Sequence, residues 1–272
     1  MNIKIFAWNY FPVSLLKIIA VITGRFKAKE KLGLVRRPWY AYGLLFAAQN
    51  ARNNNVNEIW ALEFGVAAGR GLRNLDELSK VVTKETGVKI RVAGFDTGTG
   101  MPPSTDYRDY PDKYQKGDFP MVDYEKLKSE LSENAEIIIG DVDDTVDSFR
   151  NKLTNKCPVG FVAIDVDTYT STKSALRVFE SEPEHYLPMT ISYFDDCSCR
   201  SHFNRFCGEL LAIDEFNSEH ELRKLDIDRG VWNSHRQIGP QLWYERVYIL
   251  HVFEHAKKRE LKKRSAKIIK EK

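Results

Sequence analysis

Ala61–Leu72 reads Ala-Leu-Glu-Phe-Gly-Val-Ala-Ala-Gly-Arg-Gly-Leu. The apolar run before it ends at Glu63, and three glycines follow in a short turn: Gly65, Gly69 and Gly71. Apolar residues then recur at helical spacing from Leu72 to Val82. A strand, a glycine turn and a helix in this order predict a doubly wound α/β fold. In such a fold the glycines let the backbone approach a nucleotide, and the helix N-terminus presents free N–H groups.

The spacing of these glycines distinguishes between two kinds of nucleotide-binding turn. A dinucleotide-binding fingerprint would read G-x-G-x-x-G, whereas here the glycines stand at 65, 69 and 71, with Glu63 two residues before the first. The pattern resembles the E/D-x-G-x-G-x-G turn of class I S-adenosylmethionine (SAM) methyltransferases, with Ala67 where the middle glycine usually stands. A methyl group at the point of tightest approach favours a ligand without a pyrophosphate.

Acids also stand at the tips of the next two predicted strands. Residues 88–96 end in Asp96, whose carboxylate could accept hydrogen bonds from both ribose hydroxyls of a nucleotide. Residues 135–141 end in Asp141, which could reach an adenine amino group while Val142 flanks the ring. The alternative interpretation is that Asp96 and Asp141 only cap the turn or helix that follows them.

A long stretch without periodicity, residues 97–121, separates these two strands and is rich in Gly, Pro, Tyr and Asp. Loops of this length inside compact domains are usually functional or disordered. Its aromatic and charged side chains argue against disorder, and it follows the carboxyl edge of the sheet. We therefore expect it to act as a substrate lid.

Two further strands end in pairs of acids. Residues 159–167 are an almost continuous apolar run ending in Asp165 and Asp167, as expected for a strand buried on both faces. Residues 188–196 end in Asp195 and Asp196. Clustered carboxylates repel one another, and a set of oxygen ligands suits Mg²⁺ or Ca²⁺. The alternative is a set of capping acids with Lys173 or Arg200 as counter-charges.

Taken together, these motifs resemble the macrocin/mycinamicin sugar O-methyltransferase family. The resemblance covers roughly residues 59–217 and rests on five segments: Glu63-x-Gly65, Gly94-Phe-Asp-Thr-Gly-Thr-Gly-Met-Pro102, Ile164-Asp-Val-Asp-x-Tyr-x-Ser-Thr172, Asp195-Asp196 and Gly208-Glu-Leu-Leu-Ala-Ile-Asp-Glu-Phe216. The last of these resembles the family's helix after the Asp-Asp pair. The resemblance implies a Rossmann-like class I fold with a mostly parallel, seven-stranded sheet, and dependence on SAM and Mg²⁺ or another divalent cation. It also implies that Glu63, Gly65 and Asp96 contact SAM and that Asp165, Asp195 and Asp196 ligate the metal.

The chemistry implied by the resemblance is methyl transfer to a hydroxyl. A bound cation lowers the pKa of the hydroxyl, a base removes the proton, and the alkoxide attacks the sulfonium methyl in line. His202 is the first choice of base because it closely follows Asp196. Asp167 lies beside the metal ligands, and whether it is itself a ligand stays open. His235, His251 and His255 are further candidates.

Length and composition fit one large α/β domain with decorations. The 272 residues divide into an N-terminal helical extension (1–55), a catalytic domain (56–256) and a basic C-terminal helix or tail (257–272). The four cysteines indicate reduced thiols in a cytoplasmic protein. The alternative is a zinc site made by three of them with His202, namely Cys197, Cys199 and Cys207.

The two ends of the chain differ from its middle. Residues 257–272 hold nine Lys and Arg and two Glu, a net charge of +7, so the rest of the chain is at −4. Residues 1–30 are apolar and aromatic with interspersed basic residues, and their longest strictly apolar run is too short for a membrane span. We expect an amphipathic helix that packs on the body, on a second subunit of a homo-oligomer, or on the inner face of a membrane. No specific nucleic acid is expected.

These observations predict a SAM- and Mg²⁺-dependent O-methyltransferase that acts on a hydroxyl of a sugar-containing small molecule or glycan. One alternative is a metal-dependent relative that hydroxylates, which would need iron, yet no His-rich facial triad is visible. The other is a binding or scaffold protein that has the SAM-binding fold and no turnover.

Overall fold

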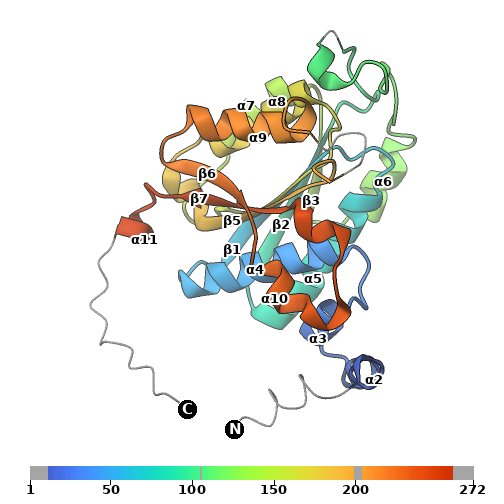
Figure 1. Cartoon of the computed structure of the whole chain (residues 1–272), viewed down its shortest axis with the longest axis vertical. Helices are drawn as coiled ribbons and strands as arrows, with labels where there is room; N and C mark the ends of the chain where they lie inside the picture. Colours follow the sequence, from blue (N-terminus) through green and yellow to red (C-terminus); the bar gives the residue numbers. More distant parts are fainter. Residues whose placement is uncertain (1–11, 105, 199–203, 260–272) are drawn as a thin grey trace.

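A seven-stranded sheet forms the centre of the protein, whose computed structural model describes residues 12–104, 106–198 and 204–259 (Figure 1). The strand order is β3-β2-β1-β4-β5-β7-β6, and only β7 runs antiparallel to its neighbours. The strands are β1 (Glu58–Phe64), β2 (Lys89–Asp96), β3 (Ala135–Ile139), β4 (Val159–Ile164), β5 (Tyr186–Phe194), β6 (Arg223–Ile227) and β7 (Val247–Val252). The predicted doubly wound, mostly parallel sheet is therefore confirmed.

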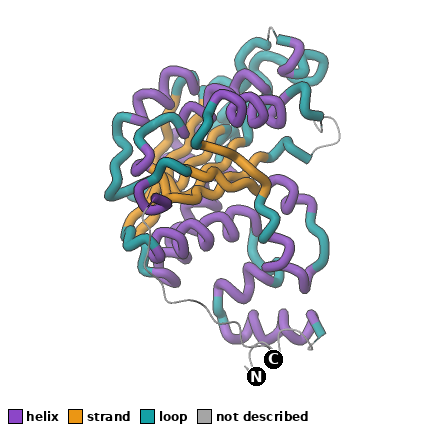
Figure 2. Tube along the Cα trace, turned by 60° about the vertical axis from the view of Figure 1, so that its left-hand side comes forward, coloured by secondary structure: helices purple, strands orange, loops and turns teal. Residues whose placement is uncertain are grey.

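Helices cover both faces of this sheet (Figure 2). One face carries α4 (Pro38–Asn53), α5 (Arg70–Thr86) and α10 (Val231–His235), and the other carries α7 (Val142–Arg150), α8 (Tyr169–Leu176) and α9 (Gly208–Glu219). The remaining α-helices are α2 (Val13–Thr23), α3 (Phe26–Lys31), α6 (Tyr124–Glu130) and α11 (Ala256–Arg259). The 3₁₀ helices include η1 (Tyr107–Asp109) in the long loop and η5 (Leu242–Arg246) just before β7.

The buried side chains form one cluster on each face of the sheet. All six residues of β4 are buried, as expected for a strand covered on both sides. Helix α4 packs on the sheet within the same cluster as α5, so it belongs to the core of the domain. The predicted division of the chain at residue 55 stays a prediction.

The last predicted strand is shorter than the sequence pattern indicates. The sequence predicts one last strand over residues 241–253. In the structure, Leu242–Arg246 forms η5, and β7 begins only at Val247. Trp243 and Tyr244 are both buried in the same core cluster. Adjacent residues of a strand point to opposite faces, so a helical turn is needed to bury both rings on one side.

Candidate active site

A cavity of about 530 Å³ opens where the strand order reverses, between the carboxyl ends of β1 and β4. Ligands of doubly wound sheets bind at this switch point. Six of the predicted cofactor-binding residues line the cavity: Glu63, Gly65, Gly71, Asp96, Asp141 and Val142. The seventh, Gly69, forms the N-cap of α5. The long loop contributes residues 100–103, Asp118 and Phe119 to the wall, which agrees with its expected place beside a ligand.

The glycine turn brings β1 and β4 into close contact. Gly65 has a φ of +87°, and a Cβ at this position would lie 1.7 Å from the backbone oxygen of Asp165. A Cβ on Gly71 would lie 1.8 Å from Oε1 of Glu63. Only glycine fits at position 65, where the clash is with backbone, whereas at position 71 the side chain of Glu63 would have to move. Ala67 adopts a left-handed φ of 44°, a conformation that costs alanine about 1–2 kcal/mol.

Asp96 holds this turn in place from the tip of β2. Its Oδ2 accepts hydrogen bonds from the backbone N–H groups of Val66 and Ala67, at 2.9 Å and 2.7 Å. Its Oδ1 accepts a third from Gly98, at 2.7 Å. Asp96 therefore acts as a cap within the turn and also lines the cavity, and its oxygens keep lone pairs that could accept further hydrogen bonds.

Asp141 likewise combines both of the roles weighed from the sequence. It is the N-cap of α7, and its side chain accepts a hydrogen bond from the Asp143 N–H at 3.0 Å. Asp141 and the largely buried Val142 both line the cavity. Capping the helix places the carboxylate of Asp141 at the rim of the cavity.

Glu63 is a buried residue of the cavity wall. The Tyr40 hydroxyl donates a hydrogen bond to its Oε1 at 2.6 Å, whereas Oε2 is buried with no hydrogen-bond partner among the described residues. Burial raises the pKa of Glu63 to about 7. A buried carboxylate oxygen without a partner is costly, and this one borders a cavity in which a cationic group could contact it.

Arg37 is a further residue of the cavity wall that the sequence did not reveal. It is the N-cap of α4 and lines the cavity, with its guanidinium 5.4 Å from the ring centre of Tyr40. Its positive charge lowers the pKa of Glu63 against the larger effect of burial. The end of the cavity near Tyr40 therefore has one cationic and one acidic side chain, which come from segments 26 residues apart in the sequence.

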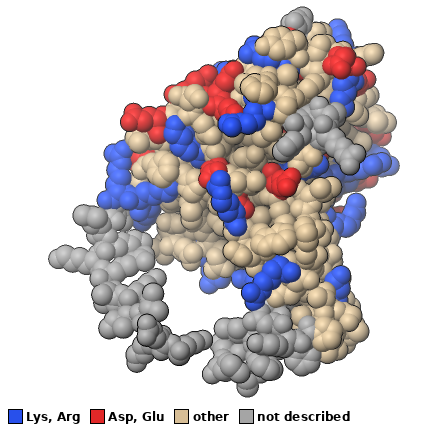
Figure 3. Space-filling model, viewed as in Figure 1, with Lys and Arg blue, Asp and Glu red and all other residues tan. Residues whose placement is uncertain are grey.

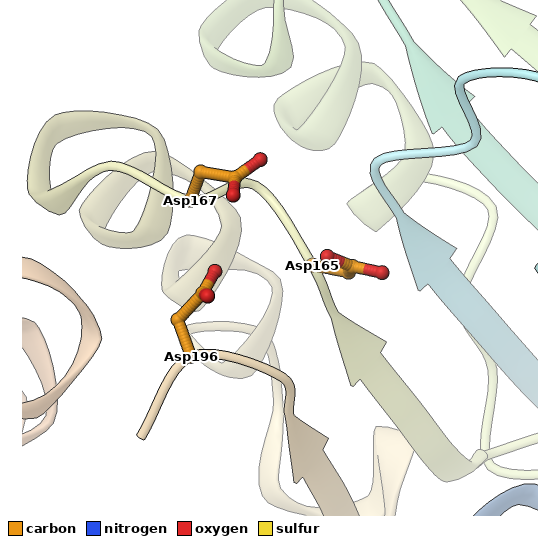
Figure 4. Close-up of side chains that lie close together, drawn as sticks. All are labelled: Asp165, Asp167 and Asp196. Atoms are coloured by element: carbon orange, nitrogen blue, oxygen red, sulfur yellow. The ribbon is translucent and has the colours of Figure 1, made fainter. Parts of the chain in front are cut away.

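Three carboxylates come together beyond the ends of β4 and β5: those of Asp165, Asp167 and Asp196 (Figure 4). Each has an oxygen within 4.8 Å of the other two. Burial raises the pKa of Asp196 to about 7, and repulsion from Asp167 adds to this. Burial and neighbouring acids also raise the pKa of Asp165. This arrangement of acids is unfavourable when all are ionised, unless a cation compensates their charge.

Asp195 points to other partners. Its Oδ1 accepts hydrogen bonds from Arg246, at 2.9 Å, and from the Tyr193 hydroxyl, at 2.7 Å. Among the described residues, the cluster that could hold an ion contains Asp167 instead of Asp195. The metal-ligand role that the resemblance implies for Asp195 stays a prediction.

The counter-charges considered for this cluster are engaged elsewhere or lie outside the described residues. Lys173 donates hydrogen bonds to Glu215 and Glu219, at 2.8 Å and 3.2 Å. Arg200, Cys199 and the proposed base His202 fall within residues 199–203, outside the described part of the chain. The zinc alternative, which needs two of them, therefore stays untested.

Two further side chains contact the carboxylate cluster in ways that the sequence did not predict. Glu209, fully buried at the start of α9, accepts a hydrogen bond from the Asp196 N–H at 2.8 Å and so orients the chain after β5. Tyr114, from the long loop, forms a side-chain hydrogen bond with Asp167. Glu209 belongs to the segment 208–216 that resembles the family's helix after the Asp-Asp pair, but its role was not predicted, because the contact with Asp196 depends on how the two segments pack. Tyr114 belongs to no recognisable motif.

Of the other histidines, His235 is fully buried and its Nε2 lies 2.5 Å from Oε1 of Glu30. His251 lies in β7, and His255 follows that strand. None of the three is among the residues that line the cavity.

Comparison with solved structures places this fold among methyltransferases. The chain is similar to CalS11, a calicheamicin methyltransferase, with a TM-score of 0.52 and 21% sequence identity over 70% of this chain and 74% of that one. It is similar to the O-methyltransferase NovP, with a TM-score of 0.52 and 16% identity over 78% of each chain. No protein-family model and no curated protein sequence matches the chain. The chain therefore has a Rossmann-like methyltransferase fold.

Proposed function

We propose that this protein is a SAM-dependent O-methyltransferase that uses a divalent cation to activate a hydroxyl of a sugar-containing small molecule or glycan. The observation that carries the proposal is the position of the carboxylate cluster. Asp165 and Asp167 line the same cavity as the glycine turn and Asp96, so a nucleoside cofactor and a cation would lie side by side. The methyltransferase fold and the described similarity to O-methyltransferases support this reading.

SAM fits the distribution of charge along the cavity. Asp96 would bind the ribose hydroxyls, and Asp141 with Val142 would border the adenine. The amino-acid end of SAM carries an ammonium and a carboxylate, and Glu63 and Arg37, both near Tyr40, offer the opposite charges in the cavity wall. Ala67 adds a methyl group to the turn, which a ligand without a pyrophosphate tolerates.

The acids also fit a hard divalent cation. Asp165, Asp167 and Asp196 offer only oxygens, the donor type that Mg²⁺ and Ca²⁺ prefer. When bound there, such a cation would lower the pKa of a substrate hydroxyl. The chain itself orients the acids, through Glu209 behind Asp196 and Tyr114 beside Asp167. The long loop, which contributes Met101–Pro103 to the wall, would shield the reacting groups from water.

The proton of the acceptor hydroxyl needs a base, for which Asp167 and His202 are the candidates. If Asp167 is the base, Asp167→Asn should abolish methyl transfer while the affinity for Mn²⁺ is retained. If Asp167 is a ligand, both should fall. Transfer of labelled methyl groups from SAM to a panel of sugars and glycosides provides the assay, and it tests the proposed function as well. A scaffold protein would bind SAM and label none of them.

Arg37→Ala is expected to weaken the binding of S-adenosylhomocysteine by about tenfold to a hundredfold, because a charge-assisted hydrogen bond is worth about 1.5–3 kcal/mol. The affinity for 5′-methylthioadenosine should not change, because this nucleoside lacks the carboxylate. Calorimetric titration of both ligands provides the comparison. Equal losses for both ligands would show that Arg37 shapes the cavity rather than binding the carboxylate.

The affinity for S-adenosylhomocysteine should depend on pH through Glu63. The ammonium group of the ligand prefers the ionised carboxylate, and burial raises the pKa of Glu63 to about 7. Lowering the pH from 8 to 6 should therefore weaken binding roughly tenfold, since ionisation must precede binding below this pKa. Glu63→Gln should bind more weakly at pH 8 and lose this pH dependence. A wild-type affinity that is flat over this range would contradict the assignment.

A further inference from the structure

The N-terminal helix α2 carries apolar side chains on two opposite faces. Leu16 and Ala20 face the body of the protein, where they are buried and cluster with Leu32. The opposite face is formed by residues at helical spacing that are 38%, 55%, 45% and 78% exposed: Leu15, Ile18, Ile19 and Ile22. Val21, 60% exposed, adjoins them. An exposed apolar face of this kind is typical of a site that contacts a membrane or another protein.

Basic residues surround this face. Without Arg37, which lines the cavity, residues 12–36 contain six Lys and Arg and one acid, Glu30. Glu30 is buried and paired with His235 at 2.5 Å, so it does not contribute an exposed negative charge. In the lower part of Figure 3, around α2 and α3, Lys and Arg are visible and Asp and Glu are not. The apolar face therefore lies in a positively charged surface.

Both ends of the chain are positively charged, whereas the segment between them is negatively charged. Residues 1–37 contain eight basic and one acidic residue, and residues 257–272 contain nine and two. Because the formal net charge is +3, the segment between them has a net charge of −11. This separation opposes self-association through two copies of α2, which would bring like charges together, and it favours a negatively charged partner.

We propose that α2 docks on the surface of a bilayer that contains anionic phospholipids. Its outer face would lie at the boundary between headgroups and acyl chains, with Arg25 and Lys27 near the phosphates. No helix of the described ranges is long and apolar enough to cross a membrane, and α2 has 11 residues against the ~20 that a span needs. Figure 1 shows α2 at the end of the molecule opposite η1. None of the residues that line the cavity belongs to α2, so docking of α2 would leave the cavity accessible.

Sedimentation of the full chain with vesicles tests this proposal. We expect binding to vesicles of phosphatidylcholine with one quarter phosphatidylglycerol, and at least tenfold weaker binding to phosphatidylcholine alone. Raising the salt concentration from about 0.05 to about 0.5 M should also weaken binding, because screening shortens the reach of the charges. The double variant Ile18→Glu/Ile22→Glu should bind anionic vesicles at least tenfold more weakly than the wild type.

The matched control is Leu222→Glu/Leu242→Glu, which adds the same charges at exposed leucines outside this face and should bind like the wild type. Circular dichroism and the mass in solution are measured for all three proteins. The proposal is overturned if the wild type does not sediment with anionic vesicles, or if both double variants lose binding equally. It is also overturned if the wild type is a dimer that only Ile18→Glu/Ile22→Glu dissociates and that does not bind vesicles.

Discussion

Replacing Asp165 with asparagine is expected to lower methyl transfer by about a thousandfold or more, the scale on which removal of a group that stabilises developing charge acts. Asp165 lies at the end of β4, between the glycine turn and the two other acids of the cluster. Mn²⁺ affinity should fall at least about a hundredfold, while the affinity for S-adenosylhomocysteine stays within about threefold. Calorimetric titrations with Mn²⁺ and with S-adenosylhomocysteine separate the two effects.

The same substitution should stabilise the protein in the absence of metal. Burial and the charges of Asp195, Asp167 and Asp196 raise the pKa of Asp165, so an uncharged amide removes a repulsion from the cluster. A Tm that rises by a few degrees in chelator, together with lost Mn²⁺ binding, would identify a metal ligand rather than a structural residue. A variant that keeps the wild-type Mn²⁺ affinity would contradict the assignment.

Asp195→Asn is the matched comparison. Its Oδ1 is held by Arg246 and Tyr193, so this change should weaken Mn²⁺ binding less than Asp165→Asn does. A loss as large as that of Asp165→Asn would make Asp195 a ligand, as the resemblance to the sugar O-methyltransferases implies.

Gly65→Ala should lower the free energy of unfolding by about 3 kcal/mol or more and abolish binding of S-adenosylhomocysteine. The new Cβ would lie 1.7 Å from the backbone oxygen of Asp165, so the turn between β1 and α5 must move. The left-handed φ of +87° adds about 1–2 kcal/mol of strain. Urea denaturation and calorimetric titration measure the two quantities.

The variant Gly87→Ala is the matched control, because it introduces the strain of a left-handed φ without a steric clash. Gly87 has a similar φ of +78°, but nothing lies within 4 Å of a Cβ built there. We expect it to cost about 1–2 kcal/mol and to leave the binding of S-adenosylhomocysteine unchanged. If Gly65→Ala were no more harmful than this control, the close contact between β1 and β4 would not be essential to the site.

The sequence predicts the fold and most of the cavity because both depend on local patterns. Apolar runs locate the strands, and the carboxyl ends of parallel strands meet at one edge of a sheet. Acids at strand tips such as Asp96 and Asp165 must therefore lie near the glycine turn. This reasoning needs no knowledge of side-chain orientation.

What the sequence could not predict depends on side-chain direction and on contacts between distant segments. Asp195 and Asp196 are adjacent, and the pattern does not tell which of them turns to Arg246 and which to Asp167. Arg37 reaches the cavity only because α4 packs across β5, β4 and β1 of the sheet. Trp243 and Tyr244 are both buried in the same core cluster. The segment that was predicted to begin the last strand therefore forms η5.

Calorimetric titration of the full chain with S-adenosylhomocysteine, with Mg²⁺ and again with excess chelator, tests the central claim most directly. The account predicts binding near a micromolar dissociation constant, about −8 kcal/mol, in both conditions, since the residues that hold the cofactor are separate from the metal ligands. Addition of a polyol acceptor should reveal a requirement for Mg²⁺. Absence of binding in both conditions would contradict the account, because the cavity at the end of β1 would then serve a different ligand.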